Sequence, residues 1–140
     1  MNFRSSTVRL SATLLACVLV AGCAGGSPCS VSGQVLFDGQ PIEAGNIKFD
    51  PIDESVGNSG SSPIKDGAYT VPTASSMHAG TFRVSVTANK KTGRQVPQFD
   101  STTLTMDEIV QYIPVRYNMQ SELTAELKPG ENQQDFKLTR

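Results

Sequence analysis

The fold of this chain is decided by residues 80–88, Gly-Thr-Phe-Arg-Val-Ser-Val-Thr-Ala. Apolar and polar side chains alternate there, so that Phe82, Val84 and Val86 share one face and Arg83 lies on the other. A period of two is typical of a strand with one face in the core and one face in water, as in antiparallel sheets. The stretch therefore predicts a half-buried β-strand.

Shorter stretches with the same alternation lie on both sides of this one. They are residues 31–37, 47–49 and 68–71 before it, and residues 122–127 and 136–138 after it. Two Asp-Gly pairs, Asp38-Gly39 and Asp66-Gly67, separate some of them. Asp-Gly is a strong indication of a tight turn, because both central residues of a type I′ turn need φ above zero. We therefore expect residues 47–49 to form the return strand after the first turn.

Two segments interrupt the alternation and are expected to be loops. Residues 53–62 are polar and rich in glycine, which is typical of a surface loop. Residues 89–114 form a longer segment, and loops of that length in a small domain are often functional. Within it, Thr105 followed by Asp107 and Glu108 resembles the start of a helix, so one or two helical turns are expected there.

The longer loop carries two groups of side chains that suggest contacts. Lys90, Lys91 and Arg94 form a basic cluster that suits anionic lipid headgroups or lipopolysaccharide, or else only solubilises a hairpin end. Apolar residues in the same loop suit packing on the domain itself or on a partner. They are Phe99, Ile109, Val110 and Tyr112.

Short strands joined by tight turns, with no long amphipathic helix, predict an all-β fold. The expected architecture is a small antiparallel sandwich of the seven-stranded type, prealbumin-like or Ig-like, with one short helix in the loop before the last two strands. The 140 residues carry 12 Lys and Arg against 13 Asp and Glu. This balance gives no support for nucleic-acid binding, which needs a basic surface.

The first residues of the chain indicate export. Arg4 and Arg9 precede an apolar run, Leu10–Val20, which is too short to span a bilayer. Ala21, Gly22 and Cys23 follow this run directly. This pattern resembles the lipobox of bacterial lipoproteins. The resemblance implies cleavage between Gly22 and Cys23, diacylglycerol on the Cys23 sulfur and acylation of the new amine.

The alternatives to this lipobox are an ordinary secretory signal with Cys23 as an incidental thiol, or modification at Cys17, which would leave a shorter apolar run. Ala24, rather than Asp, after the cysteine favours the outer over the inner membrane. The domains expected are a cleaved signal peptide (1–22), a lipidated flexible tether (23–30) and a sandwich (31–140). Cys29 would then be a lone thiol on the tether, with no disulfide in the domain.

The order of the strands and turns is similar to that of carboxypeptidase-regulatory-like, or transthyretin-like, β-sandwich domains. The match covers most of the chain after the tether and is carried by residues 31–42, 47–51, 66–71, 80–86, 113–118 and 123–138. It implies a prealbumin-like sandwich exported to the envelope, and no particular activity. Transthyretin-like hydrolases use several histidines and end in Tyr-Arg-Gly-Ser, whereas this chain has one histidine and ends Leu138-Thr139-Arg140.

Candidate chemical sites are few. His78 is the one histidine, so a serine nucleophile has no evident base, and a zinc site built on it lacks partners with ligand spacing. The alternatives are a copper site with Met77, Met106 and Met119, or an ordinary, partly exposed loop residue. Asp50, Asp53 and Glu54, with Asn58 nearby, form the densest acidic cluster and are the candidate ligands for Ca²⁺, although no EF-hand spacing is present.

These observations predict a lipoprotein anchored in the cell envelope and facing the periplasm. We expect a non-enzymatic β-sandwich, without a cofactor, that acts as a binding or structural module with an envelope protein or a glycan as partner. The alternative is a carbohydrate- or calcium-binding module of the envelope.

Overall fold

The computed structural model describes residues 26–53, 56–99 and 103–140. The predicted signal peptide and the predicted cleavage site between Gly22 and Cys23 lie outside the described residues. The described strands are β1 (Cys29–Phe37), β2 (Gln40–Pro41), β3 (Ala44–Pro51), β4 (Gly60–Lys65), β5 (Ala68–Val71), β6 (Gly80–Thr87), β7 (Asn89–Pro97), β8 (Thr105–Gln111), β9 (Thr124–Leu127), β10 (Gly130–Gln133) and β11 (Phe136–Leu138). The described 3₁₀ turns include η2 (Thr73–Ser75) and η3 (Val115–Tyr117).

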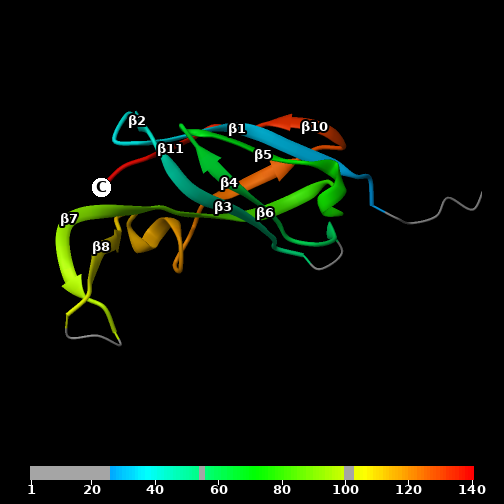
Figure 1. Cartoon of the computed structure of the whole chain (residues 1–140). Coiled ribbons are helices and arrows are strands. Elements are labelled where there is room, and N and C mark those ends of the chain that lie inside the picture. The colour runs from blue at the N-terminus through cyan, green and yellow to red at the C-terminus, as the bar shows by residue number, and fades with distance from the viewer. Residues whose placement is uncertain (1–25, 54–55, 100–102) are drawn as a thin grey trace, which may run out of the picture.

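The chain folds as an all-β protein, which confirms the predicted class. One sheet runs in the order β10-β1-β5-β4-β3-β6-β9, with β2 and β11 also paired to β1. This sheet curls into two facing layers, with β1, β5 and β10 in one and β3 and β6 in the other (Figure 1). Its pairs are antiparallel except that β1 runs parallel to β10 and β11. A second, small sheet contains β7 and β8.

The core lies between the two layers and follows the predicted alternation. Phe82, Val84 and Val86 of β6 are buried, while Arg83 is exposed. Phe49 of β3 is fully buried at the centre of an aromatic cluster, where its ring centroid lies 5.9 Å from Tyr69, 6.4 Å from Phe82 and 6.3 Å from Phe136. Burial of one such side chain contributes about 1.5–3 kcal/mol.

Both predicted Asp-Gly turns are present. Asp38 and Gly39 have φ of 50° and 81°, and Asp66 and Gly67 have φ of 49° and 81°. The first turn returns the chain into β2, however, and not into the strand that contains Phe49 as predicted. That strand, β3, leaves β1 and pairs with β4 and β6, because the chain crosses from one layer to the other after Pro41.

The helical turns expected after Thr105 are wrong. Residues 105–111 form β8, which pairs antiparallel with β7. Thr105, Ile109 and Val110 are β-branched and favour a strand, and one or two turns of helix are unstable without packing. Backbone hydrogen bonds to β7 therefore determine the local structure, and much of the predicted 89–114 loop is a hairpin.

Two other boundaries differ from the prediction. Cys29, expected on a flexible tether, is 0% exposed and begins β1. Its amide donates to the Met77 carbonyl at 3.0 Å, and it stands opposite Gly130 of β10. The predicted 53–62 surface loop is also shorter, because β4 begins at Gly60 and Ser62 is buried. Both segments are ordered because they pair with strands that lie elsewhere in the sequence.

Candidate functional site

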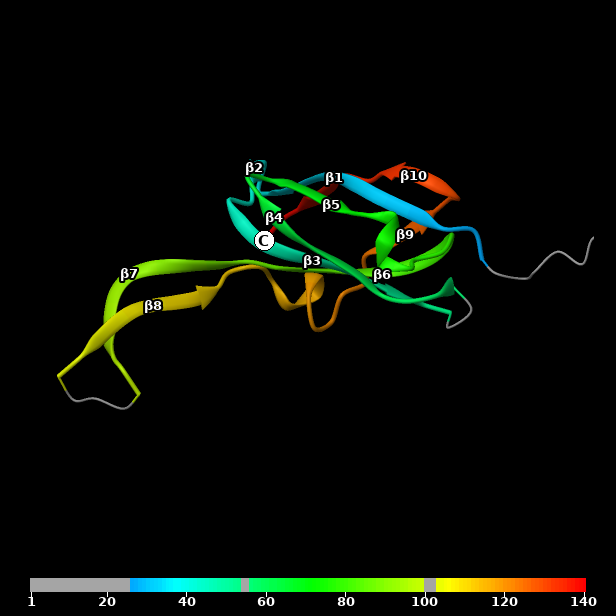
Figure 2. The same cartoon turned by 45° about the vertical axis from the view of Figure 1, so that its right-hand side comes forward.

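The hairpin of β7 and β8 projects from the sandwich (Figures 1 and 2). We call this hairpin, with Gln98, Phe99 and Leu104 at its end, the arm. Its two strands pair with each other, and in the described part of the chain neither pairs with another strand. An isolated two-stranded hairpin is only marginally stable in water. The arm is therefore the part of the described structure whose shape is least explained by the needs of the core.

Pairs of opposite charge cross the arm between its strands. Lys91 Nζ lies 2.6 Å from Asp107 Oδ2, and Arg94 Nη1 lies 3.8 Å from Glu108 Oε1. The Thr92 hydroxyl also donates to Glu108 Oε2 at 2.7 Å. The hydrogen bond with Asp107 raises the pKa of Lys91, and the hydrogen bonds from Lys91 and Gln95 lower the pKa of Asp107. The arm's own carboxylates thus offset the predicted basic cluster, which weakens its attraction for anionic lipid.

The arm exposes apolar side chains, three near its end and one, Ile109, opposite Lys91 near its base. The exposed fractions are 105% for Phe99, 59% for Leu104, 49% for Met106 and 56% for Ile109. The predicted apolar residues of this segment therefore divide into two groups. Tyr112 packs on the domain, edge to face with Phe37 at 5.6 Å between centroids, whereas Phe99 and Ile109 face solvent.

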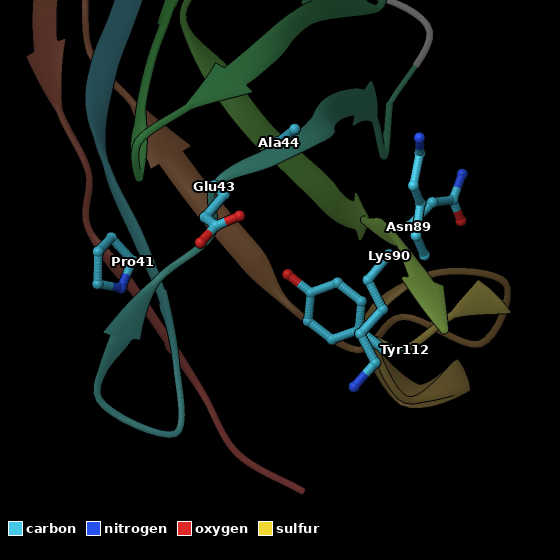
Figure 3. A pocket seen from close by; sticks show the side chains of 7 residues that line it. Pro41, Glu43, Ala44, Asn89, Lys90 and Tyr112 are labelled. Carbon is cyan, nitrogen blue, oxygen red and sulfur yellow. The ribbon is translucent and has the colours of Figure 1, made fainter. Parts of the chain in front are cut away.

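A cleft of about 550 Å³ lies where the arm joins the sandwich. Pro41, Glu43 and Ala44 line it from the sandwich, and Asn89, Lys90, Lys91 and Tyr112 line it from the arm. Figure 3 shows the Glu43 carboxylate directed toward the Tyr112 hydroxyl, with Lys90 lying along the ring. The Lys90 ammonium is 5.3 Å from the ring centroid, a cation–π distance.

Two groups that line the cleft have shifted pKa values, Lys91, which is paired with Asp107, and Tyr112. Burial, and then the negative charge of Glu43, raise the pKa of Tyr112 above its usual value of 10.0. The phenol therefore stays protonated at neutral pH and offers a hydrogen-bond donor beside a carboxylate acceptor. The sequence prediction did not include Pro41, Glu43 or Ala44, because only the crossing from β2 to β3 brings them to the arm.

The proposed calcium ligands are only partly in place. The Asp50 carboxylate binds the Lys48 ammonium at 2.7 Å and the Ser59 hydroxyl at 2.7 Å. Asp53 is exposed, and Glu54 lies outside the described residues. Within residues 26–53, 56–99 and 103–140, no three His, Cys, Asp or Glu side chains gather closely enough to hold a metal ion.

His78 is held by close contact with the backbone. Its amide donates to the Val56 carbonyl at 3.0 Å. A Cβ at Gly57 would lie 2.6 Å from His78 Nδ1, and a Cβ at Gly26 would lie 2.8 Å from His78 Cβ. The imidazole thus occupies space that two glycines leave open, which is a packing role.

Comparison with known proteins finds no match among protein-family models, curated proteins or solved structures. No helix in the described ranges is long and apolar enough to cross a membrane. The lipidation site Cys23 lies outside those ranges, so lipid anchoring stays a prediction from the sequence.

Proposed function

We propose that this protein is a lipid-anchored lipoprotein of the cell envelope, a non-enzymatic β-sandwich that binds a partner through its arm. The observation that carries the proposal is the arm itself, a projecting hairpin with Phe99, Leu104 and Met106 exposed near its end and Ile109 exposed nearer its base. Apolar groups gathered on a projection mark sites of protein or membrane interaction.

The positions of the two ends of the molecule support this function. The start of β1 lies at the end of the sandwich opposite the arm (Figure 1). Two residues, Ala24 and Gly25, lie between Cys23 and Gly26, so the Cα of Cys23 would lie within about 11 Å of the Cα of Gly26. An anchored molecule would therefore hold its sandwich at the bilayer and direct its arm elsewhere, toward a partner. Two or more acyl chains, as the lipobox implies, suffice for stable anchoring.

The proposal assigns no reaction to the protein. His78 is half-buried and packs between Gly26 and Gly57. The cleft beside Tyr112 combines a phenol, a carboxylate and an ammonium, which are groups suited to recognition by hydrogen bonds and charge.

Labelling with radioactive fatty acid tests the anchoring. We expect the wild-type protein and the Cys29→Ala variant to be labelled, and Cys23→Ala to be unlabelled and found in the soluble periplasmic fraction. Cys29 is a matched control because its thiol is buried in β1. Equal labelling of Cys23→Ala, or an uncut precursor in the cytosol, contradicts the proposal.

Capture of partners from solubilised envelope tests the arm. The double variant Phe99→Ser/Leu104→Ser removes the exposed apolar groups at the arm's end. We expect it to capture at least tenfold less partner than the wild type. A matched control, Ile52→Ser, removes an exposed apolar side chain elsewhere on the surface and should leave capture unchanged. Equal capture by both variants shows that the arm is not the contact surface.

A second candidate function is carbohydrate binding in the cleft at the base of the arm. Sugar hydroxyls exchange hydrogen bonds with carboxylates, amides and phenols, and Glu43, Asn89 and Tyr112 present one of each. NMR titration with an oligosaccharide of N-acetylglucosamine should shift the resonances of these residues, and Glu43→Gln should weaken the response. Unshifted resonances at millimolar sugar exclude this candidate.

Calorimetry with Ca²⁺, before and after Asp53→Ala, tests the calcium alternative. An absent heat signal excludes it.

A further inference from the structure

The two outer edges of the arm differ in how they resist pairing with another strand. The β7 edge carries Lys90, Lys91 and Arg94, ends at Pro97, and contains a bulge between Lys91 and Gln95. Lysine, proline and bulges are the features by which proteins block a sheet edge. The β8 edge has no Lys, Pro or bulge in residues 105–111. Asp107 and Glu108 are the charged residues of β8, and both are paired with cations of β7. The β8 edge is thus the less protected of the two, and no described strand other than β7 pairs with β8.

The free edge of β8 presents a regular row of backbone groups. The Tyr112 amide donates to the Ala88 carbonyl and the Gln98 amide donates to the Leu104 carbonyl, so even-numbered residues from 104 to 112 face β7. Antiparallel pairs alternate between bonded and non-bonded positions. The amides and carbonyls of Thr105, Asp107, Ile109 and Gln111 therefore point away from β7, toward solvent.

We propose that β8 pairs antiparallel with β8 of a second copy of this chain, about a two-fold axis at Ile109. This inference goes beyond the proposed function, because it places a contact at residues 107–111 and not at the exposed end of the arm; it rests on the proposed function for the membrane anchor. The two arms would form one four-stranded sheet, and the two sandwiches would lie at its opposite ends. Such an interface is isologous, as in most homodimers.

Charge selects the register of this pairing. An axis at Asp107 or at Glu108 would place two identical carboxylates directly opposite each other, which is destabilising. An axis at Ile109 places Ile109 opposite the partner's Ile109. Asp107 then faces the partner's Gln111, and Glu108 faces the partner's Val110. Among these registers, only the last one avoids like charges while pairing residues 107–111 of both copies.

Charge also favours a second copy over a strongly charged partner. Asp107 and Glu108 are already paired with Lys91 and Arg94 of the same arm, so the β8 edge has little net charge to attract a basic strand. Without residues 1–22, which hold Arg4 and Arg9 and no acid, the chain has 10 Lys and Arg against 13 Asp and Glu, a formal net charge of −3, so repulsion between two copies is modest. Five paired residues bury less than the roughly 800 Å² per partner of a standard interface, so membrane anchoring is needed to raise the effective concentration.

Disulfide crosslinking of the full-length protein in isolated envelopes tests the pairing. In the Ile109→Cys variant the two thiols would lie on residues about 5.5 Å apart between Cα atoms, within disulfide range. Mild oxidation should convert most of this variant into a covalent dimer, at least tenfold more than Gln95→Cys on the protected edge. The wild-type protein is the control for crosslinks through the native cysteines, of which Cys29 is buried. Equal yields from the two variants, or a disulfide to a different protein, overturn the proposal.

A mixed experiment tests the register. Coexpressed Asp107→Cys and Gln111→Cys copies should crosslink to each other, because these positions face each other across the axis. Asp107→Cys alone should not, since two such residues would lie about 14 Å apart along the strands. Fatty-acid labelling of the same envelopes distinguishes failure of the β8 pairing from failure of the lipid anchor. Labelled protein without crosslinking overturns the pairing alone, and unlabelled protein overturns the anchor.

Discussion

Replacing Phe49 by alanine tests whether the aromatic cluster holds the two layers together. Phe49 is fully buried on β3, and its ring packs near Tyr69, Phe82 and Phe136, which come from three other strands. Phe-to-Ala changes in cores cost about 3–5 kcal/mol, as lost transfer free energy and as an unfilled cavity. Because this ring contacts three aromatic neighbours, we expect Phe49→Ala to lower the free energy of unfolding by about 4 kcal/mol.

Urea denaturation followed by circular dichroism measures this loss. For a slope of about 2 kcal/mol per molar urea, the midpoint should fall by about 2 M, with the slope unchanged. Phe99→Ala is the matched control, because the same side chain is removed from a fully exposed position on the arm. We expect the control to change the free energy of unfolding by less than about 0.5 kcal/mol.

The comparison between the two phenylalanines can refute the reasoning. A loss below 1 kcal/mol for Phe49→Ala would mean that the aromatic cluster does not hold the layers together. A loss at Phe99 equal to that at Phe49 would mean that the arm is part of the folding unit, and the proposal that it is reserved for a partner would then fail.

Three further predictions concern the same fold. In Gly33→Ala the new Cβ would lie 1.9 Å from the backbone oxygen of Gln134, so we expect a loss of at least about 2 kcal/mol in thermal unfolding; Gly39→Ala, which has open space but a φ of 81°, should lose only about 1 kcal/mol. Burial and the charge of Asp135 raise the pKa of Tyr69, so the protonated phenol stabilises the fold below pH 10, and this stabilisation is lost as the pH rises further. In denaturation at pH 9 and 11, Tyr69→Phe should lack this loss of unfolding free energy at the higher pH. Burial alone would raise the pKa of Asp50, but hydrogen bonds from Lys48 and Ser59 and the charges of Lys48 and Arg83 lower it. The ionised Asp50 therefore stabilises the fold above pH 3.8, and this stabilisation is lost as the pH falls below that value. NMR titration should show that Lys48→Met raises the pKa of Asp50.

Local patterns predicted the strands and turns, because alternation and Asp-Gly act over a few residues. Residues 80–88 show this best, since the alternation alone identified which side chains are buried. Residues 105–111 show the opposite case. Thr105 followed by two acids resembles a helix start, but pairing with β7 supplies the backbone hydrogen bonds that make a strand. A partner strand overrides a local preference that is weak.

Distant pairing also explains the other differences. Glycine, serine and proline before Cys29 indicate a flexible tether, yet β10 fixes Cys29 from about a hundred residues further along the chain. The cleft beside Tyr112 was not predicted for the same reason, since Glu43 belongs to no motif. The candidate site was anticipated only in part, as a long segment with basic and apolar residues.

The position of β1 has a consequence for the export that the sequence predicts. The first strand of the sandwich lies between β5 on one side and the last two strands, β10 and β11, on the other. A chain still emerging from a translocation channel has no β10 or β11 to offer, so its leading strand keeps an unpaired edge until synthesis and export are complete. Closure of such long loops is slow, and topology of this kind delays folding. In the predicted export, this connectivity would keep the polypeptide threadable until β10 and β11 have passed.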